Sequence, residues 1–388
     1  MVKSANRIQN VKEYYFSKKL QEVKALDTIE KPIINLGIGS PDLQPHPAVI
    51  AKLNEVSKLG KSHAYQPYKG TLELREAVTD FYKRIFNVQL DSASEIVPLM
   101  GSKEGIMHIM MAFVNEGDEV LLPNPGYPTY AATAEFVGAK ISHYDLKEEH
   151  NWQIDLVDLK NKINPKVKLM FINTPHMPTG SKLNDSVLQE LVKIAKEKHF
   201  LLVNDNPYSI ILNQEYRSLL NVKGAKEICL ELNSMSKSHN MAGWRIGWCM
   251  GSSEHIDAIM KVKSNMDSGM FLALQKAAIE ALNLDDSWFK NLNEIYQKRQ
   301  KYAMKIAELL DCSFDSNQSG LFLWAKVPET IKSVEQLIDD ILHACKVFIC
   351  PGFIFGSNGN RYIRIALCAD EKNLEVACQR IKEWIETK

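Results

Sequence analysis

Ser234-Met235-Ser236-Lys237 lies just beyond an apolar stretch at 228–232, and Arg245 follows the lysine eight positions later. The apolar stretch predicts a strand that ends shortly before the lysine. A lysine that attacks a carbonyl must lose its proton readily, and partial burial and a nearby cation both favour the neutral amine. The planar fork of an arginine matches a phosphate. A Schiff-base lysine beside a phosphate anchor suggests pyridoxal phosphate, while a solvated loop lysine is the alternative that these residues leave open.

Strands predicted at 96–100, 118–122, 168–173, 199–204 and 228–232 alternate with helical stretches. This alternation is typical of an α/β fold with a mostly parallel sheet covered on both faces. Asp205 follows the fourth of these strands, at a carboxyl end where open α/β sheets bind ligands.

Beyond residue 285 a long amphipathic stretch at 292–310 alternates with short strands. The stretch at 361–367 alternates apolar and polar residues as an edge strand does. We predict a second, smaller α+β domain built from the two chain ends. The expected bounds are 1–45 for an N-terminal arm with part of the small domain, 46–284 for the large domain, and 285–388 for the small C-terminal domain.

The composition excludes several classes of protein. The 388 residues carry 47 basic and 47 acidic side chains, so nothing calls for nucleic acid or an anionic membrane as a partner. Seven scattered cysteines without a CxxC pair favour neither a disulfide framework nor a metal site. The N-terminus lacks an apolar signal core, and no run of 18 apolar residues predicts a spanning helix. We expect a cytoplasmic protein.

Two further stretches are candidates for ligand contact. Ser102 and Lys103 follow a predicted strand and Gly101 and open a helix, whose free N–H groups suit an anion; an ordinary helix cap is the alternative. Tyr127 lies in a loop stiffened by prolines, where a fixed ring either covers a flat cofactor or packs on the surface.

Together these stretches resemble the class I/II aminotransferases, fold type I of the pyridoxal phosphate enzymes, over roughly residues 30 to 385 with the motifs in the family's order. The resemblance implies a large domain with a mostly parallel, seven-stranded sheet and a smaller domain. It also implies pyridoxal 5'-phosphate as cofactor, a homodimer with shared active sites, and a place in amino-acid biosynthesis.

The resemblance also implies roles for individual residues. Lys237 holds the cofactor and moves the proton between the substrate Cα and the cofactor carbon. Asp205 pairs with the pyridine nitrogen, so that the ring absorbs the carbanion's electrons. Tyr208 donates to the ring phenolate. Arg364 grips the substrate α-carboxylate through a bidentate pair.

The phosphate cup, as the resemblance implies it, consists of Ser102, Lys103, Ser234, Ser236 and Arg245. Tyr127 stacks on the cofactor ring. Tyr65 reaches the phosphate of the neighbouring subunit, and Gly39 lies in a loop that closes over the substrate.

Met177 departs from the family pattern. The family has Asn-Pro-Thr-Gly where this chain has Met177-Pro178-Thr179-Gly180, and that asparagine donates to the cofactor's phenolate oxygen. Methionine has no donor, which leaves Tyr208 as the main one. We expect the protonated linkage between Lys237 and the cofactor to titrate at a higher pH than in Met177→Asn.

The predicted function is an aminotransferase that moves an amino group between an L-amino acid and a 2-oxo acid such as 2-oxoglutarate. Aromatic residues at 14–16 favour an aromatic donor, whereas Lys18 or Lys19 would suit a dicarboxylic one. The alternatives are a lyase or synthase on the same fold, which uses the same lysine and carboxylate, and an inactive binding protein, which the presence of Lys237 disfavours.

Overall fold

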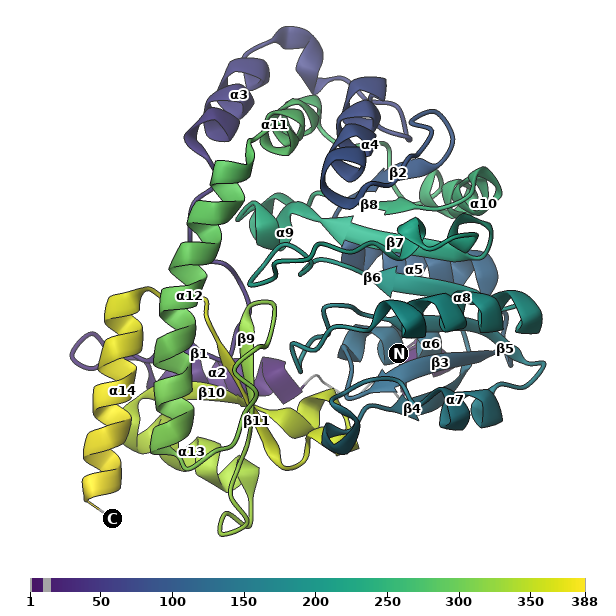
Figure 1. Ribbon diagram of the computed structural model, residues 1–388. Coiled ribbons are helices and arrows are strands. Elements are labelled where there is room, and N and C mark those ends of the chain that lie inside the picture. Colours follow the sequence, from purple (N-terminus) through teal and green to yellow (C-terminus); the bar gives the residue numbers. More distant parts are fainter. Residues whose placement is uncertain (1, 10–14, 388) are drawn as a thin grey trace.

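The computed structural model of the chain describes residues 2–9 and 15–387. Figure 1 shows a large sheet with helices packed against it and a smaller sheet beside it. Residues 34–36 and strands between 322 and 366 form the smaller sheet, whereas the N mark lies near the large sheet. The predicted α/β fold class is confirmed: one sheet has seven strands and is mostly parallel, and the other has four.

The large sheet has the strand order β2-β8-β7-β6-β5-β3-β4. Pairing is parallel from β7 through β6, β5 and β3 to β4, whereas β8 is antiparallel to both of its neighbours. The strands are β2 (Ile96–Leu99), β3 (Glu119–Asn124), β4 (Lys140–Asp145), β5 (Val167–Ile172), β6 (Leu201–Asp205), β7 (Cys229–Ser234) and β8 (Gly247–Met250).

Both faces of this sheet are apolar because successive side chains of a strand point to opposite faces. In β5, Leu169 and Phe171 join the core on one face, while Met170 and Ile172 join the core on the other. Helices α5, α6 and α10 cover the first face, and α4, α7, α8 and α11 cover the second. A strand buried on both sides therefore appears in the sequence as a continuous apolar run.

The helices are α1 (Asn6–Gln9), α2 (Tyr15–Leu26), α3 (Pro47–Ser57), α4 (Leu72–Phe86), α5 (Ser102–Phe113), α6 (Pro128–Phe136), α7 (Leu156–Lys162), α8 (Asp185–Lys198), α9 (Met235–Ser238), α10 (Ser253–Lys263), α11 (Leu272–Leu282), α12 (Asp286–Leu309), α13 (Val334–Cys345) and α14 (Glu371–Glu386). Short 3-10 turns occupy Gly60–His63, Glu148–His150, Leu219–Asn221, Ala225–Glu227, Ala242–Trp244, Gly352–Phe355 and Ser357–Gly359. Among the described residues, no helix is both long enough and apolar enough to cross a membrane.

The small sheet has the order β1-β10-β11-β9 and unites the two ends of the chain. Its strands are β1 (Ile34–Leu36), β9 (Phe322–Lys326), β10 (Val347–Pro351) and β11 (Tyr362–Ala366). The prediction of an edge strand at 361–367 was wrong, because β11 lies between β10 and β9 and all five of its residues are buried. The domain bounds at 45 and 284 stay a proposal, consistent with β1 pairing to β10 and with α12 starting at Asp286.

Strand direction brings distant parts of the chain to one edge of the large sheet. Gly247, the first residue of β8, pairs with Ser234 at the end of β7 and with Leu99 at the end of β2. Because β8 is antiparallel, the start of this strand meets the carboxyl ends of its neighbours. Arg245 and Ser102, which flank these pairs in the chain, consequently lie beside Ser234.

Candidate active site

A cavity of about 480 Å³ opens at the carboxyl ends of the large sheet, facing the small sheet. It brings together every predicted site residue except Tyr65. The predicted residues that line it are Gly39, Ser102, Lys103, Tyr127, Met177, Asp205, Tyr208, Ser234, Ser236, Lys237, Arg245 and Arg364.

Lys237 lies in the short helix α9, directly after β7, and its Nζ donates a hydrogen bond to the carbonyl of Gly39. Burial lowers the pKa of Lys237, and the guanidinium groups of Arg364 and Arg245 lower it as well. The charge of Asp205 acts in the opposite direction. The structure thus provides the setting that the sequence suggested for an amine nucleophile.

Asp205 ends β6 and is only 6% exposed. Its Oδ2 accepts a hydrogen bond of 2.9 Å from the Tyr130 hydroxyl, whereas its buried Oδ1 has no hydrogen-bond partner among the described residues. Burial raises the pKa of this carboxyl to about 6, although the bond from Tyr130 and the charge of Lys237 both lower it. An unsatisfied buried oxygen is costly, so this one is suited to accept from a donor that the described part of the chain does not supply.

Arg364 is a buried cation in β11 that no carboxylate among the described residues neutralises. Its guanidinium lies 3.9 Å from the ring centre of Phe322 and 4.6 Å from that of Phe355. Nη2 donates to the Gly37 carbonyl at 2.7 Å, and Nε is buried without a partner. Such a group, stacked between rings and short of an anion, is ready to bind a carboxylate.

Met177 contacts the same arginine. Its Sδ lies 3.2 Å from Nη1 of Arg364, and its backbone N–H donates to Oδ1 of Asn173 at 2.7 Å. The side chain is buried at the cavity wall. Thioether sulfur is a weak acceptor and no donor, so position 177 provides no hydrogen to a ligand here.

The residues predicted for the phosphate cup surround the start of α5. Gly101 caps this helix with φ of 85° and no side-chain hydrogen bond, so the first N–H groups of the helix are free for an anion. Ser234 accepts from the Ser236 N–H at 3.4 Å. A Cβ on Gly101 would overlap the Arg245 guanidinium, so glycine allows this arginine to lie against the helix start.

Tyr208 and Tyr127 both line the cavity. Tyr208 packs edge-on against Phe322, and the Nζ of Lys237 lies 6.0 Å from its ring centre. Burial raises the pKa of Tyr208 well above its ordinary value, so its hydroxyl keeps its proton and remains a donor. Tyr127 caps α6 and contacts Tyr130 edge-on at 5.5 Å.

Tyr65 lies outside the cavity and is 90% exposed. Its loop packs on a second exposed segment: His63 stacks on Phe271 at 5.7 Å, and Gly269 lies against the carbonyls of Gln66 and Pro67. Within this chain Tyr65 therefore has no role in the cavity.

Sequence reasoning missed two polar residues of the site. Tyr130 holds Asp205, and its ring stacks on Phe171 at 4.6 Å. Asn173 follows β5, donates to the Asp205 carbonyl, and accepts from the Met177 N–H. Their positions in the sequence could have identified them, because each lies directly after a strand or at a helix start, on the edge of the sheet that binds ligands.

The N-terminal segment contributes differently from what was expected. Phe16 lines the cavity, whereas Tyr15 packs against Phe353, and Tyr14 lies outside the described residues. Lys19 is buried and bonded to Glu22 at 2.7 Å and Asp339 at 2.8 Å, so it is not available for an acidic substrate.

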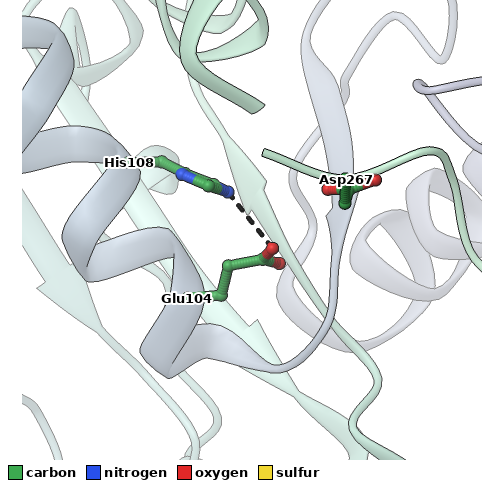
Figure 2. Close-up of side chains that lie close together, drawn as sticks. All are labelled: Glu104, His108 and Asp267. Atoms are coloured by element: carbon green, nitrogen blue, oxygen red, sulfur yellow. Dashed lines mark ion pairs between the residues drawn. The ribbon is translucent and has the colours of Figure 1, made fainter. Parts of the chain in front are cut away.

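A charged cluster lies one helical turn beyond the phosphate cup. Figure 2 shows the imidazole of His108 facing the carboxylate of Glu104, at 3.3 Å, with Asp267 across from them. The three ligand atoms lie within 4.8 Å of one another, which is close enough for a metal. However, the ammonium of Lys263 contacts both oxygens of Asp267, at 2.7 and 2.8 Å, and already takes the place of a cation there.

Comparisons with known proteins agree with this geometry. The family model for aminotransferase class I and II matches residues 31–381. LL-diaminopimelate aminotransferases from Halothermothrix orenii and Aquifex aeolicus are 36% and 37% identical and cover 98% of this chain, which spans 98% and 99% of their lengths. A substrate-bound BacF structure from Bacillus subtilis superposes with a TM-score of 0.92 at 32% identity, covering 99% of this chain and 98% of its own. The chain belongs to the class I and II aminotransferases, enzymes that depend on pyridoxal 5'-phosphate.

Proposed function

We propose that this aminotransferase moves an amino group from a free L-amino acid to a 2-oxo acid such as 2-oxoglutarate, with Lys237 as the proton carrier. The observation that carries the proposal is a set of three groups in one cavity that suit this chemistry. These are an amine whose pKa is lowered, a buried carboxylate oxygen of Asp205 without a donor, and a buried Arg364 without an anion.

The residues present fit pyridoxal 5'-phosphate. The free Oδ1 of Asp205 would accept from the pyridine N–H, and the start of α5 with Arg245 would hold the phosphate. When bound, this cofactor supplies an aldehyde that accepts the amino group and a ring that withdraws electrons. The Tyr208 hydroxyl would donate a hydrogen bond to the phenolate oxygen, and Tyr127 would cover the ring.

Lys237 would act twice on the same proton. Its neutral amine would take the proton from the substrate Cα and deliver it to the cofactor carbon, and water would then be needed to release the 2-oxo acid. The first step needs a neutral amine, and burial favours that form by lowering the pKa of Lys237. Gly39, whose carbonyl holds Nζ, would keep the amine on the substrate side of the cavity.

Arg364 would orient the substrate by binding its α-carboxylate. The gap between Phe322 and Phe355 fixes the plane of the guanidinium, and the Gly37 carbonyl fixes its rotation. A carboxylate bound to this fork would hold the substrate in the cavity that Lys237 also lines.

A lyase or synthase on the same scaffold is the second candidate, and Met177 is the observation that favours it. Without an amide donor at this position, the phenolate oxygen would have one hydrogen bond fewer. The thioether sulfur of Met177 contacts Arg364 in its place. The relatives named LL-diaminopimelate aminotransferase favour transamination.

We also propose that the chain works as a homodimer in which Tyr65 contributes to the neighbouring site. Large apolar side chains are exposed around its loop: Tyr65 is 90% exposed, Met266 60%, Tyr68 48% and Phe271 37%. A second copy would cover this face. The cytoplasmic location stays a prediction.

The experiment that tests the proposed reaction measures products. The holoenzyme is incubated with an amino acid and 2-oxoglutarate, and glutamate and the new 2-oxo acid are quantified by mass spectrometry. We expect equal amounts of both products and none with Lys237→Ala. Release of ammonia without glutamate would contradict transamination and favour the lyase.

A further inference from the structure

We propose that Asp42 and Arg299 are positioning residues of the active site, an inference that rests on the proposed function and adds two residues to it. Their ion pair holds the loop at 37–44, which follows β1, so that its carbonyl groups face Arg364 and Lys237. Neither residue is among the described residues that line the cavity, so the pair acts on the substrate through this loop.

The pair is a two-point contact between a buried cation and a carboxylate near the surface. Nη1 of Arg299 donates to Oδ1 of Asp42 at 2.6 Å, and Nη2 donates to Oδ2 at 3.0 Å. The arginine side chain is 1% exposed and the aspartate side chain 31%. Two parallel bonds fix the orientation of a carboxylate as well as its distance, so Asp42 anchors the loop in one position.

Arg299 also joins this loop to the strand that carries the α-carboxylate anchor. It lies in α12, and its Nη1 donates to the carbonyl of Leu367 at 3.1 Å. Leu367 comes three residues after Arg364 in the sequence. Asp42 comes three residues after Gly39. One guanidinium therefore holds two segments, each within a few residues of a group that the reaction uses.

The loop holds two functional side chains through its main chain. The Gly37 carbonyl accepts from Nη2 of Arg364 at 2.7 Å. The Gly39 carbonyl accepts from Nζ of Lys237. A Cβ on Gly39 would overlap the ring of Phe322, on which Arg364 stacks, so the loop lies directly against the anchor. Because a carbonyl moves with its backbone, a displaced loop would release both side chains.

Two further contacts hold the loop, and both join neutral groups. Oδ1 of Asn35 accepts from backbone N–H groups two and three residues later, at 3.0 and 3.2 Å. Asn240 donates to the carbonyl of Gln44 at 3.2 Å. Bonds between charged groups are roughly twice as strong as neutral ones. The pair of Asp42 and Arg299 should therefore contribute most to the position of the loop.

Two substitutions test the pair in different ways. Asp42→Asn removes the negative charge and keeps the shape of the side chain. Arg299→Lys keeps the positive charge and removes the planar fork that makes the two-point contact. A role in positioning predicts that both variants fold and that both misplace the loop.

Asp339→Asn is the matched control. Asp339 lies in α13, its side chain is 32% exposed, and it bonds Lys19, which is 10% exposed. It is not among the described residues that line the cavity. In each pair the cation keeps a second carboxylate after the substitution, Glu22 for Lys19 and Glu371 for Arg299.

The first measurement follows the holoenzyme by absorbance as glutamate, the donor that corresponds to 2-oxoglutarate, converts the cofactor to its amine form. We expect kcat/KM to fall by about 10–100-fold in Asp42→Asn and Arg299→Lys, because a small misplacement of a binding group has an effect of this size. It should stay unchanged in Asp339→Asn. An unchanged kcat/KM in the two test variants would overturn the inference.

Two further measurements separate positioning from a general loss of stability. In Asp42→Asn combined with Arg364→Lys, the loss of kcat/KM should be smaller than the product of the separate losses, because both changes disturb the same alignment. Hydrogen exchange of the backbone amides at 37–44 in the holoenzyme, followed by mass spectrometry, should accelerate in Asp42→Asn and not in Asp339→Asn. Losses that simply multiply, or unchanged exchange, would overturn the inference.

Failure of the proposed function has a different signature. A wild-type holoenzyme that glutamate and other amino acids do not convert would contradict the aminotransferase reaction. The exchange measurement requires no reaction, so it still decides whether Asp42 and Arg299 hold the loop.

Discussion

Asp205→Asn should stabilise the cofactor-free protein while it weakens cofactor binding. The carboxylate is 6% exposed, and one of its oxygens has no hydrogen-bond partner. The amide has nearly the same shape and no charge, so the substitution removes mainly the cost of burying an anion. A residue kept for the cofactor is therefore predicted to destabilise the fold without it.

The size of the effect follows from the pKa. Burial raises the pKa of Asp205 from 3.8 to about 6 in the folded protein. Between these values the folded state binds the proton more tightly than the unfolded state, so wild-type stability falls as the pH rises through this window. The difference between the two pKa values corresponds to about 3 kcal/mol of unfolding free energy. This stability is fully lost above about pH 6 and regained below about pH 4.

The assay is chemical unfolding of cofactor-free protein, followed by tryptophan fluorescence from pH 4 to pH 8. The advantage of Asp205→Asn over wild type in unfolding free energy should be small at pH 4 and should grow to about 3 kcal/mol at pH 8. Asp80→Asn, which removes an exposed carboxylate on α4, is the control for a change of net charge. An advantage that does not depend on pH would refute the reasoning, because it would show that the anion is not the cause.

Three further substitutions test other parts of the site. Tyr130→Phe removes the hydrogen-bond donor to Asp205, so the pKa of this carboxyl should rise further. In the same titration, the pH range over which the unfolding free energy falls should extend to higher pH. An unchanged range would count against the contact. Met177→Asn restores a donor beside the phenolate oxygen, so the visible absorbance should titrate at a lower pH than in wild type, and an equal or higher midpoint would be inconsistent with the account. Gly101→Ala forces a side chain into φ of 85° and into a guanidinium of the phosphate cup, so the dissociation constant of the cofactor should rise at least tenfold (~1.4 kcal/mol). Gly117→Ala, at φ of 84° but in open space, is its control and should leave that constant unchanged.

The large sheet and its ligand edge were predictable from sequence because each depends on local pattern. Buried parallel strands appear as apolar runs, and the residue after such a run is at the ligand edge, as Asp205 shows. Lys237 was predictable for the same reason, since it follows β7. The roles of Asp205 and Lys237, in contrast, were inferred from the resemblance to the aminotransferases. The structure supplies the geometry that makes those roles chemically reasonable.

The features that could not be predicted from the sequence depend on contacts between segments that are distant in the chain. Alternation at 361–367 indicated an edge strand because Arg364 is polar, but this arginine faces a cavity instead of solvent. Phe16 and Ile354 share a wall only because β1 and α2 pack against strands from the other end of the chain. Lys19 looked free in the sequence, and its partner Asp339 lies 320 residues away.

The central claim is that this cavity transfers an amino group, and the absorbance of the purified yellow holoenzyme tests it most directly. A single amino acid is added without a 2-oxo acid. The account predicts that the visible band of the lysine-bound cofactor disappears, that the band of the amine form grows, and that 2-oxoglutarate reverses the change. A visible band that persists with every amino acid, or its loss with release of ammonia, would contradict the account.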